Sequence, residues 1–79
     1  MDNVLHYTPL YLQVKNLILK QIVDGRYPPG SVIPSEPSLA KMYGTSMSTI
    51  RQAINLLVAE GVLAKKQGKE PAMVDKDGL

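Results

Sequence analysis

The chain has 79 residues, enough for one small domain, and 44% of them are apolar. Because it contains no Trp or Phe, its core must be aliphatic with tyrosine at the rim, and the absence of Cys excludes disulfides and thiolate metal sites. The net charge of +2 is unevenly distributed, since residues 41–69 hold five basic residues and one acidic residue.

An apolar stripe that follows a short lead-in predicts the first helix. Residues 1–7 show no period, so we expect a flexible N-terminal lead-in there. Thr8 suits an N-cap and Pro9 the first helical position, where a missing amide hydrogen costs nothing. The helix should end near Gly25, which can take the left-handed conformation of a C-terminal cap. Its core-facing stripe is Leu10, Val14, Leu17, Ile18 and Ile22, and Lys15 and Lys20 should face solvent.

A turn, a stub strand and a short helix follow. The Pro-Gly pair at residues 29–30 suits the central positions of a type II turn, and a stub strand over residues 31–34 is closed by a proline. Ser35 is a second candidate N-cap, and Glu36 is favourably placed against the helix dipole. The short helix should end at Gly44, and its apolar residues are Leu39, Ala40 and Met42.

The clearest amphipathic pattern runs from Ser46, a candidate N-cap, to Gly61, a candidate helix stop. Its apolar stripe is Ile50, Ala53, Ile54, Leu57 and Val58. The first two turns carry Met47, Ser48, Thr49, Arg51, Gln52 and Asn55 on the other faces. Short hydrogen-bonding side chains with a single charge suit a helix end that lies in a groove of DNA. The alternative is an ordinary bundle helix that these residues cap and solubilise.

A short helix, the tight turn at residues 44–46 and a longer helix form a helix-turn-helix. The apolar segments 62–64 and 72–74 then flank a basic stretch with Gly68 at its bend, which predicts a β-hairpin. The stub strand could pair as a third strand of this sheet.

We therefore predict a mainly α fold with a small β-sheet, a winged helix-turn-helix of three helices and a β-hairpin wing. It should occupy residues 8–74, between the lead-in at 1–7 and a linker or tail at 75–79. Pro71 removes one hydrogen-bond donor from the last strand, which makes that strand the weakest part of the prediction. The core should include Leu10, Leu17, Ile22, Leu39, Ile54 and Leu57.

Four features predict contacts with double-stranded DNA. The starts of two helices offer amides to phosphates, and the basic second half of the domain supplies the expected electrostatic footprint. Arg51 could pair with guanine or clamp a phosphate, and its alternative role is a surface ion pair. The wing tip could enter the minor groove, and its alternative is a solvated hairpin. The predicted DNA-binding residues are Ser35, Ser46, Met47, Ser48, Thr49, Arg51, Gln52, Lys65, Lys66, Gln67, Gly68 and Lys69.

Catalytic chemistry has little support in the sequence, and we expect neither an enzyme nor a cofactor. His6 is the only histidine, the carboxylates are scattered, and the glycines are too dispersed to form a phosphate loop. No apolar run approaches the roughly 20 residues of a membrane span, and no basic and apolar leader opens the chain. These features favour the cytoplasm.

The chain resembles the GntR-type winged-helix transcription regulators over about residues 8–69. The resemblance lies in residues 9–13, in residues 25–36 and in the ordered motifs that follow: Leu39 and Ala40, Tyr43 and Gly44, residues 46–53 and residues 60–63. It implies an N-terminal DNA-binding domain that is usually followed by a domain for a small effector and for dimerisation. A homodimer on a palindrome-like operator is the expected partner arrangement.

The match departs from the family pattern at three places. Pro37 and Met47 stand where the family commonly has arginines that contact DNA, which implies a different operator or weaker affinity. Past the wing tip, residues 70–74 replace the usual Gly-Thr-Phe-Val. The alternative function is a winged-helix module that binds another protein, which requires exposed apolar anchors on the third helix. Met47 is the single candidate for such an anchor.

Overall fold

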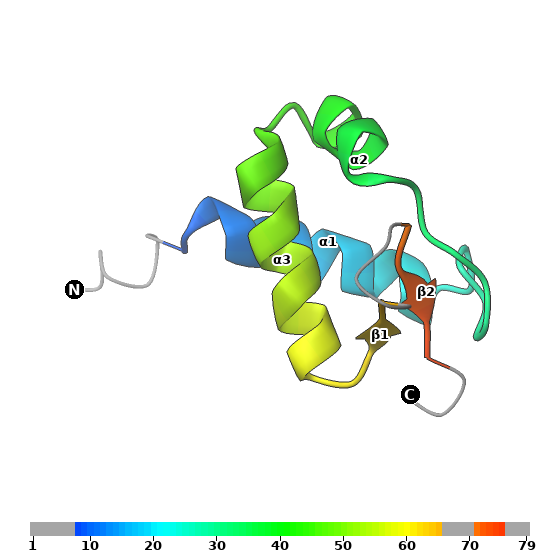
Figure 1. The fold of residues 1–79 in the computed structure, drawn as a ribbon. Helices are drawn as coiled ribbons and strands as arrows, with labels where there is room; N and C mark the ends of the chain where they lie inside the picture. Colours follow the sequence, from blue (N-terminus) through cyan, green and yellow to red (C-terminus); the bar gives the residue numbers. More distant parts are fainter. Residues whose placement is uncertain (1–7, 66–70, 76–79) are drawn as a thin grey trace.

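The computed structural model describes residues 8–65 and 71–75. The expectations for the lead-in at 1–7 and for most of the tail, residues 76–79, lie outside these residues. Within the described part of the chain, three helices precede two short strands (Figure 1). They are α1 (Leu10–Val23), α2 (Glu36–Tyr43), α3 (Met47–Ala59), β1 (Leu63–Ala64) and β2 (Met73–Val74). No helix in this part of the chain is long and apolar enough to cross a bilayer.

The core lies where α3 crosses α1, with α2 packed against α3 and the strands at the far end of α1 (Figure 1). It is aliphatic, as predicted, and Tyr27 and Tyr43 pack at its rim. Because α3 contacts both other helices, it is held by packing on more than one side. The buried hydrophobic residues are Val14, Ile18, Ile22, Ile33, Leu39, Ile50, Ala53, Ile54, Leu57, Val62, Leu63, Ala72 and Val74.

The predicted core face of α1 is partly wrong. Leu10 and Leu17 were expected in the core, but they are 50% and 45% exposed. The buried residues are Val14, Ile18 and Ile22, which follow one another at a spacing of four. A helix turns by about 100° per residue, so Leu17 points roughly a quarter turn away from Ile18. The two leucines therefore lie together on a flank of the helix that the core does not cover.

Two further expectations for α1 need correction. Lys15 was expected to face solvent, but its side chain is only 17% exposed and its ammonium lies 3.1 Å from a carboxylate oxygen of Glu60 at the end of α3. The reason is that Lys15 follows Val14 and borders the buried face. The N-cap is Pro9 rather than Thr8, because Pro9 has an extended backbone and the helix begins at Leu10. Lys20 does face solvent and pairs with Asp24.

The helix-turn-helix forms as predicted, and its boundaries follow the local signals. Ser35 and Ser46 cap α2 and α3 with their side chains. Gly44 ends α2 with a φ of 65°, and Gly61 follows α3 with a φ of 80°. A residue with a Cβ strongly disfavours this left-handed region, so these two glycines fix where the helices stop.

The small sheet also confirms the predicted strands. β1 and β2 are antiparallel, with Leu63 opposite Val74 and Ala64 opposite Met73. Val32 forms an isolated antiparallel bridge with Met73, so the stub strand adds to the other edge of β2. The last strand therefore forms despite Pro71. Ile33 and Val74, both fully or almost fully buried, bring this sheet against the core.

Candidate nucleic-acid interface

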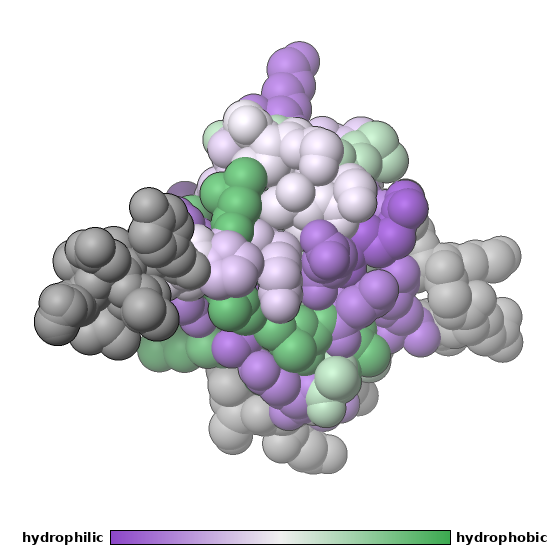
Figure 2. Space-filling model, turned by 90° about the vertical axis from the view of Figure 1, so that its left-hand side faces the viewer, coloured by the Kyte–Doolittle hydropathy of each residue, from purple (hydrophilic) through white to green (hydrophobic). Residues whose placement is uncertain are grey.

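The first two turns of α3 present a polar face away from the core. Its core side is Ile50, Ala53, Ile54 and Leu57. Ser48, Arg51, Gln52 and Asn55 are exposed, Met47 is 40% exposed, and Thr49 is half-buried. In Figure 2, residues of intermediate hydropathy dominate the upper part of one face, at the height of α2 and the start of α3 in Figure 1. This surface is neither strongly apolar nor densely charged.

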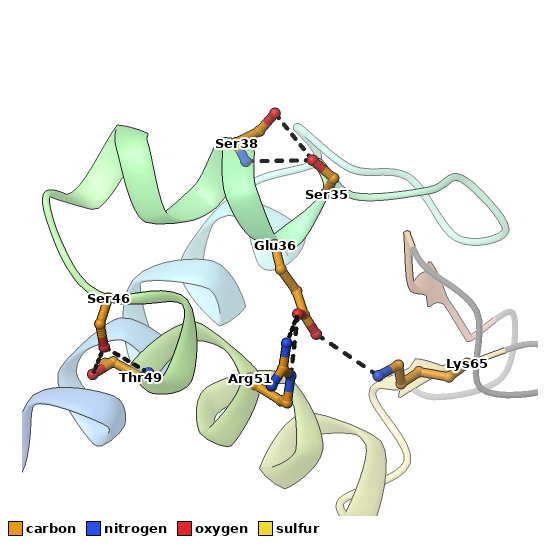
Figure 3. Close-up of polar contacts among 7 residues, drawn as sticks. All are labelled: Ser35, Glu36, Ser38, Ser46, Thr49, Arg51 and Lys65. Carbon is orange, nitrogen blue, oxygen red and sulfur yellow. Dashed lines mark hydrogen bonds and ion pairs between the residues drawn. The ribbon is translucent and has the colours of Figure 1, made fainter.

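The predicted N-caps Ser35 and Ser46 are engaged in the same way. The Ser46 hydroxyl accepts from the Thr49 amide at 3.1 Å and donates to the Thr49 hydroxyl at 3.0 Å. The Ser35 hydroxyl accepts from the Ser38 amide at 3.3 Å and donates to the Ser38 hydroxyl at 3.1 Å (Figure 3). One amide in the first turn of each helix is thus already satisfied within the protein. Phosphate binding at these helix starts stays a prediction.

Replacing Ser46 with alanine is expected to lower the free energy of unfolding by about 1 kcal/mol, because the Thr49 amide loses its capping oxygen. Urea unfolding should show a lower midpoint with an unchanged slope. Ser48→Ala is the matched control, since Ser48 is exposed on the same helix turn and should change stability by less than about 0.5 kcal/mol. Equal midpoints for the two variants would contradict the capping role.

Arg51 lies in an ion pair that joins two helices. Its Nε and one terminal nitrogen donate to the same oxygen of Glu36, at 3.2 and 2.9 Å. The Glu36 side chain is 4% exposed, whereas the Arg51 side chain is 55% exposed. The sequence placed Glu36 correctly in the first turn of α2 but did not indicate that it is buried. An ion pair was the alternative expected for Arg51, and the structure shows it in a partly buried form.

Lys65 lies beside this pair. Its ammonium is 3.8 Å from the second Glu36 oxygen, and its side chain is 22% exposed. Residues from α2, from α3 and from the position directly after β1 therefore meet around one carboxylate (Figure 3). The other predicted wing residues, Lys66, Gln67, Gly68 and Lys69, lie outside the described residues.

Metal binding and acid–base catalysis have little support among the described residues. Residues 8–65 and 71–75 contain no cluster of three His, Cys, Asp or Glu side chains that could hold a metal ion. Partial burial raises the pKa of the Tyr43 phenol above its ordinary value of 10.0, with a further rise from Tyr27 and an opposing effect from Arg26. Tyr43 therefore stays neutral near pH 7. It serves as a core-rim residue rather than as a base.

The chain matches a known protein family over most of its length. The model for bacterial regulatory proteins of the gntR family matches residues 10–70. The chain belongs to this gntR family. The match spans all three helices and β1 and ends before β2, and it confirms the resemblance seen in the sequence. The family is one of bacterial regulatory proteins, in agreement with the expectation of a regulator rather than an enzyme.

Curated relatives carry the same domain within longer chains. The gntR-family chain is 45% identical over 62 residues to an uncharacterized HTH-type transcriptional regulator, YurK, of Bacillus subtilis (strain 168), covering 78% of this chain and 26% of that protein. It is 43% identical over 60 residues to a histidine utilization repressor of Pseudomonas putida, covering 76% of this chain and 24% of the relative. The chain thus spans about a quarter of the length of these relatives.

A solved structure shares the winged-helix architecture. The DNA-binding domain of AraR in complex with operator ORX1 superposes with a TM-score of 0.80 at 39% sequence identity. The alignment covers 87% of this chain and 82% of that one. The predicted fold class, a winged helix-turn-helix, is confirmed by this similarity together with the helix and strand order.

Proposed function

We propose that this chain binds duplex DNA sequence-specifically, as the DNA-reading domain of a transcription regulator. The observation that carries the proposal is the composition of α3: its core side is buried, while its first two turns expose short polar side chains and Arg51. A helix of this kind fits the major groove with its N-terminal residues toward base edges. The operator complex of the similar AraR domain supports the same role.

Base reading in this proposal falls to Met47, Ser48, Thr49, Arg51 and Gln52. Ser48 and Gln52 can donate and accept hydrogen bonds at base edges, and Arg51 can pair with guanine. Met47 offers no hydrogen bond, so its exposed side chain suits an apolar contact such as a thymine methyl group. Pro37, in the first turn of α2, and Met47 stand at the two positions where the family commonly has arginines, so neither position carries a positive charge. The operator should therefore differ from those that such arginines read.

Phosphate binding falls to the helix starts at Ser35 and Ser46 and to the basic wing. Lys65 and Lys66 would follow the DNA backbone, since lysine acts as a point charge without base geometry. The tip, Gln67 to Lys69, would reach the minor groove, where Gly68 permits close approach of the backbone. These contacts give affinity and orientation, and α3 supplies the choice of sequence.

One domain would read one half-site, so we propose a homodimer on a palindrome-like operator. The dimerising and effector-binding parts would lie in a further domain, as the greater length of the relatives suggests. The linker assigned to residues 75–79 would lead to that domain. We place this regulator in the cytoplasm, where it would meet its operator.

The test is selection of random duplex DNA by this domain, followed by titration of the enriched sequence and a scrambled control across salt concentrations. If about four phosphates are contacted, the affinity should fall roughly a hundredfold between about 50 and 200 mM salt. The enriched sequence should also bind more tightly than the scrambled control at every salt concentration.

Two outcomes would contradict the proposal in different ways. Equal, salt-sensitive binding to both sequences would remove sequence specificity and leave only a basic surface. No binding at low salt would favour the alternative function, a winged-helix module for a protein partner. In that case Met47 would be the first residue to test as an apolar anchor.

A further inference from the structure

Glu36 is a charged residue in a buried position. It is the first residue of α2 and is 3% exposed, the one buried charged residue in the described part of the chain. An ionised carboxylate loses much hydration free energy on burial, so it must be compensated by cations and hydrogen bonds. Its location at the start of a helix contributes through the helix dipole, but the dipole alone does not explain the burial.

Two of the residues that compensate Glu36 are ones that the proposed function assigns to DNA. One Glu36 oxygen accepts two hydrogen bonds from the Arg51 guanidinium, and the other lies 3.8 Å from the Lys65 ammonium (Figure 3). Arg51 lies on α3, and Lys65 directly follows β1. A single carboxylate therefore connects the helix-turn-helix to the beginning of the wing.

We propose that Glu36 is a positioning residue for sequence reading, which orients the Arg51 guanidinium and the Lys65 ammonium before DNA binds. The proposal rests on the proposed function. Two hydrogen bonds to one carboxylate oxygen restrict the planar guanidinium, while the Arg51 side chain stays 55% exposed and accessible. A side chain ordered in advance loses less conformational entropy on binding, so its base contact gains strength and selectivity.

The negative charge of Glu36 allows a positioning role to be distinguished from a role in phosphate binding. Glu36 is negative and repels phosphate, so it cannot itself add to non-specific affinity. Removing its charge should leave binding to scrambled DNA unchanged or slightly stronger. Binding to the operator should become weaker, because Arg51 loses its fixed orientation. Loss of a residue with a purely structural role would instead weaken binding to both DNAs together.

The test compares Glu36→Gln with the wild-type domain on the selected operator and on scrambled DNA. We expect the ratio of the two affinities to fall by about fivefold to a hundredfold, the range of one lost bidentate base contact. Asp24→Asn is the matched control, since it removes the same charge from an exposed ion pair on the surface between α1 and the following turn. That variant should keep the wild-type ratio.

A double-mutant cycle with Arg51→Ala tests whether Glu36 acts through Arg51. If it does, Glu36→Gln should lower the affinity ratio little further once Arg51 is absent. Additive losses in the cycle would overturn the proposal, and so would a Glu36→Gln variant that melts at a lower temperature but keeps the wild-type ratio. A wild-type domain without operator preference would instead refute the proposed function.

Glu36→Asp covers the case in which the glutamine variant does not fold. It keeps the negative charge that compensates Arg51 and Lys65 but shortens the side chain by one methylene group. We expect a folded domain with a reduced ratio of operator to scrambled affinity. A folded Glu36→Asp variant with the full wild-type ratio would show that the orientation of Arg51 does not depend on Glu36.

Discussion

Replacing Leu57 with alanine is expected to lower the free energy of unfolding by about 2–5 kcal/mol. Leu57 is fully buried on the core side of α3, the helix that packs against both α1 and α2. The smaller side chain loses apolar contacts and leaves a cavity that its neighbours fill only in part. A domain of this size has a total stability of roughly 4–12 kcal/mol, so the loss would be a large fraction of it. Urea unfolding followed by circular dichroism measures the change.

Leu17→Ala is the control, because it makes the same chemical change on a half-exposed flank of α1. Leu17 is 45% exposed, so the variant should lose less than about 1 kcal/mol. The sequence alone assigned both leucines to the core, and this pair of variants separates the two assignments. Equal losses would show that the flank of α1 around Leu17 is covered in solution.

The sequence predicted the parts of the fold that are decided by local chemistry. Ser35 and Ser46 cap their helices because a short hydroxyl side chain can reach the amide three residues ahead. Gly44 and Gly61 end helices because they adopt positive φ at little cost. Such signals depend on a few neighbouring residues, so they can be recognised without a three-dimensional structure.

The sequence-based expectations were wrong where contacts between distant elements decide which side chains are buried. A stripe of apolar residues shows which side of α1 is apolar, but the direction from which α3 crosses it decides that Leu17 stays outside. Lys15 is drawn toward Glu60, 45 positions further along the chain, which no helical period can indicate. Periodicity therefore predicts that a helix packs, and tertiary contacts decide which part of its stripe is covered.

The candidate site also combines features that the local sequence predicts with a feature that only tertiary contacts decide. The exposed polar face of α3 was predicted from the apolar stripe opposite to it, and the structure places its residues there. The role of Glu36 was missed, because its partners lie 15 and 29 residues away in sequence and only the fold brings them together. A glutamate at a helix start has an adequate local explanation in the dipole, which hides a second role.

Replacing Arg51 with alanine is expected to weaken operator binding by about 1–3 kcal/mol more than binding to scrambled DNA. The expectation follows from the exposed guanidinium on the first turns of α3, which Glu36 holds in place. A base contact exists only with the correct sequence, so its loss should appear as a lower ratio of the two affinities. Fluorescence anisotropy titrations on both DNAs at several salt concentrations measure this ratio.

Arg51→Lys distinguishes geometry from charge. Lysine keeps the positive charge beside Glu36 but cannot present two parallel N–H groups to guanine. If Arg51 reads a base, the lysine variant should lose much of the same selectivity while its salt dependence stays close to wild type. If Arg51 only clamps a phosphate, the lysine variant should bind both DNAs nearly normally. The alanine variant should then bind both DNAs equally more weakly, and its salt slope should be smaller by about 1. Thermal melts of both variants are needed beside the titrations, because either change alters a contact of the buried Glu36 carboxylate. A partly unfolded domain would bind both DNAs less well without any change in the ratio of the two affinities.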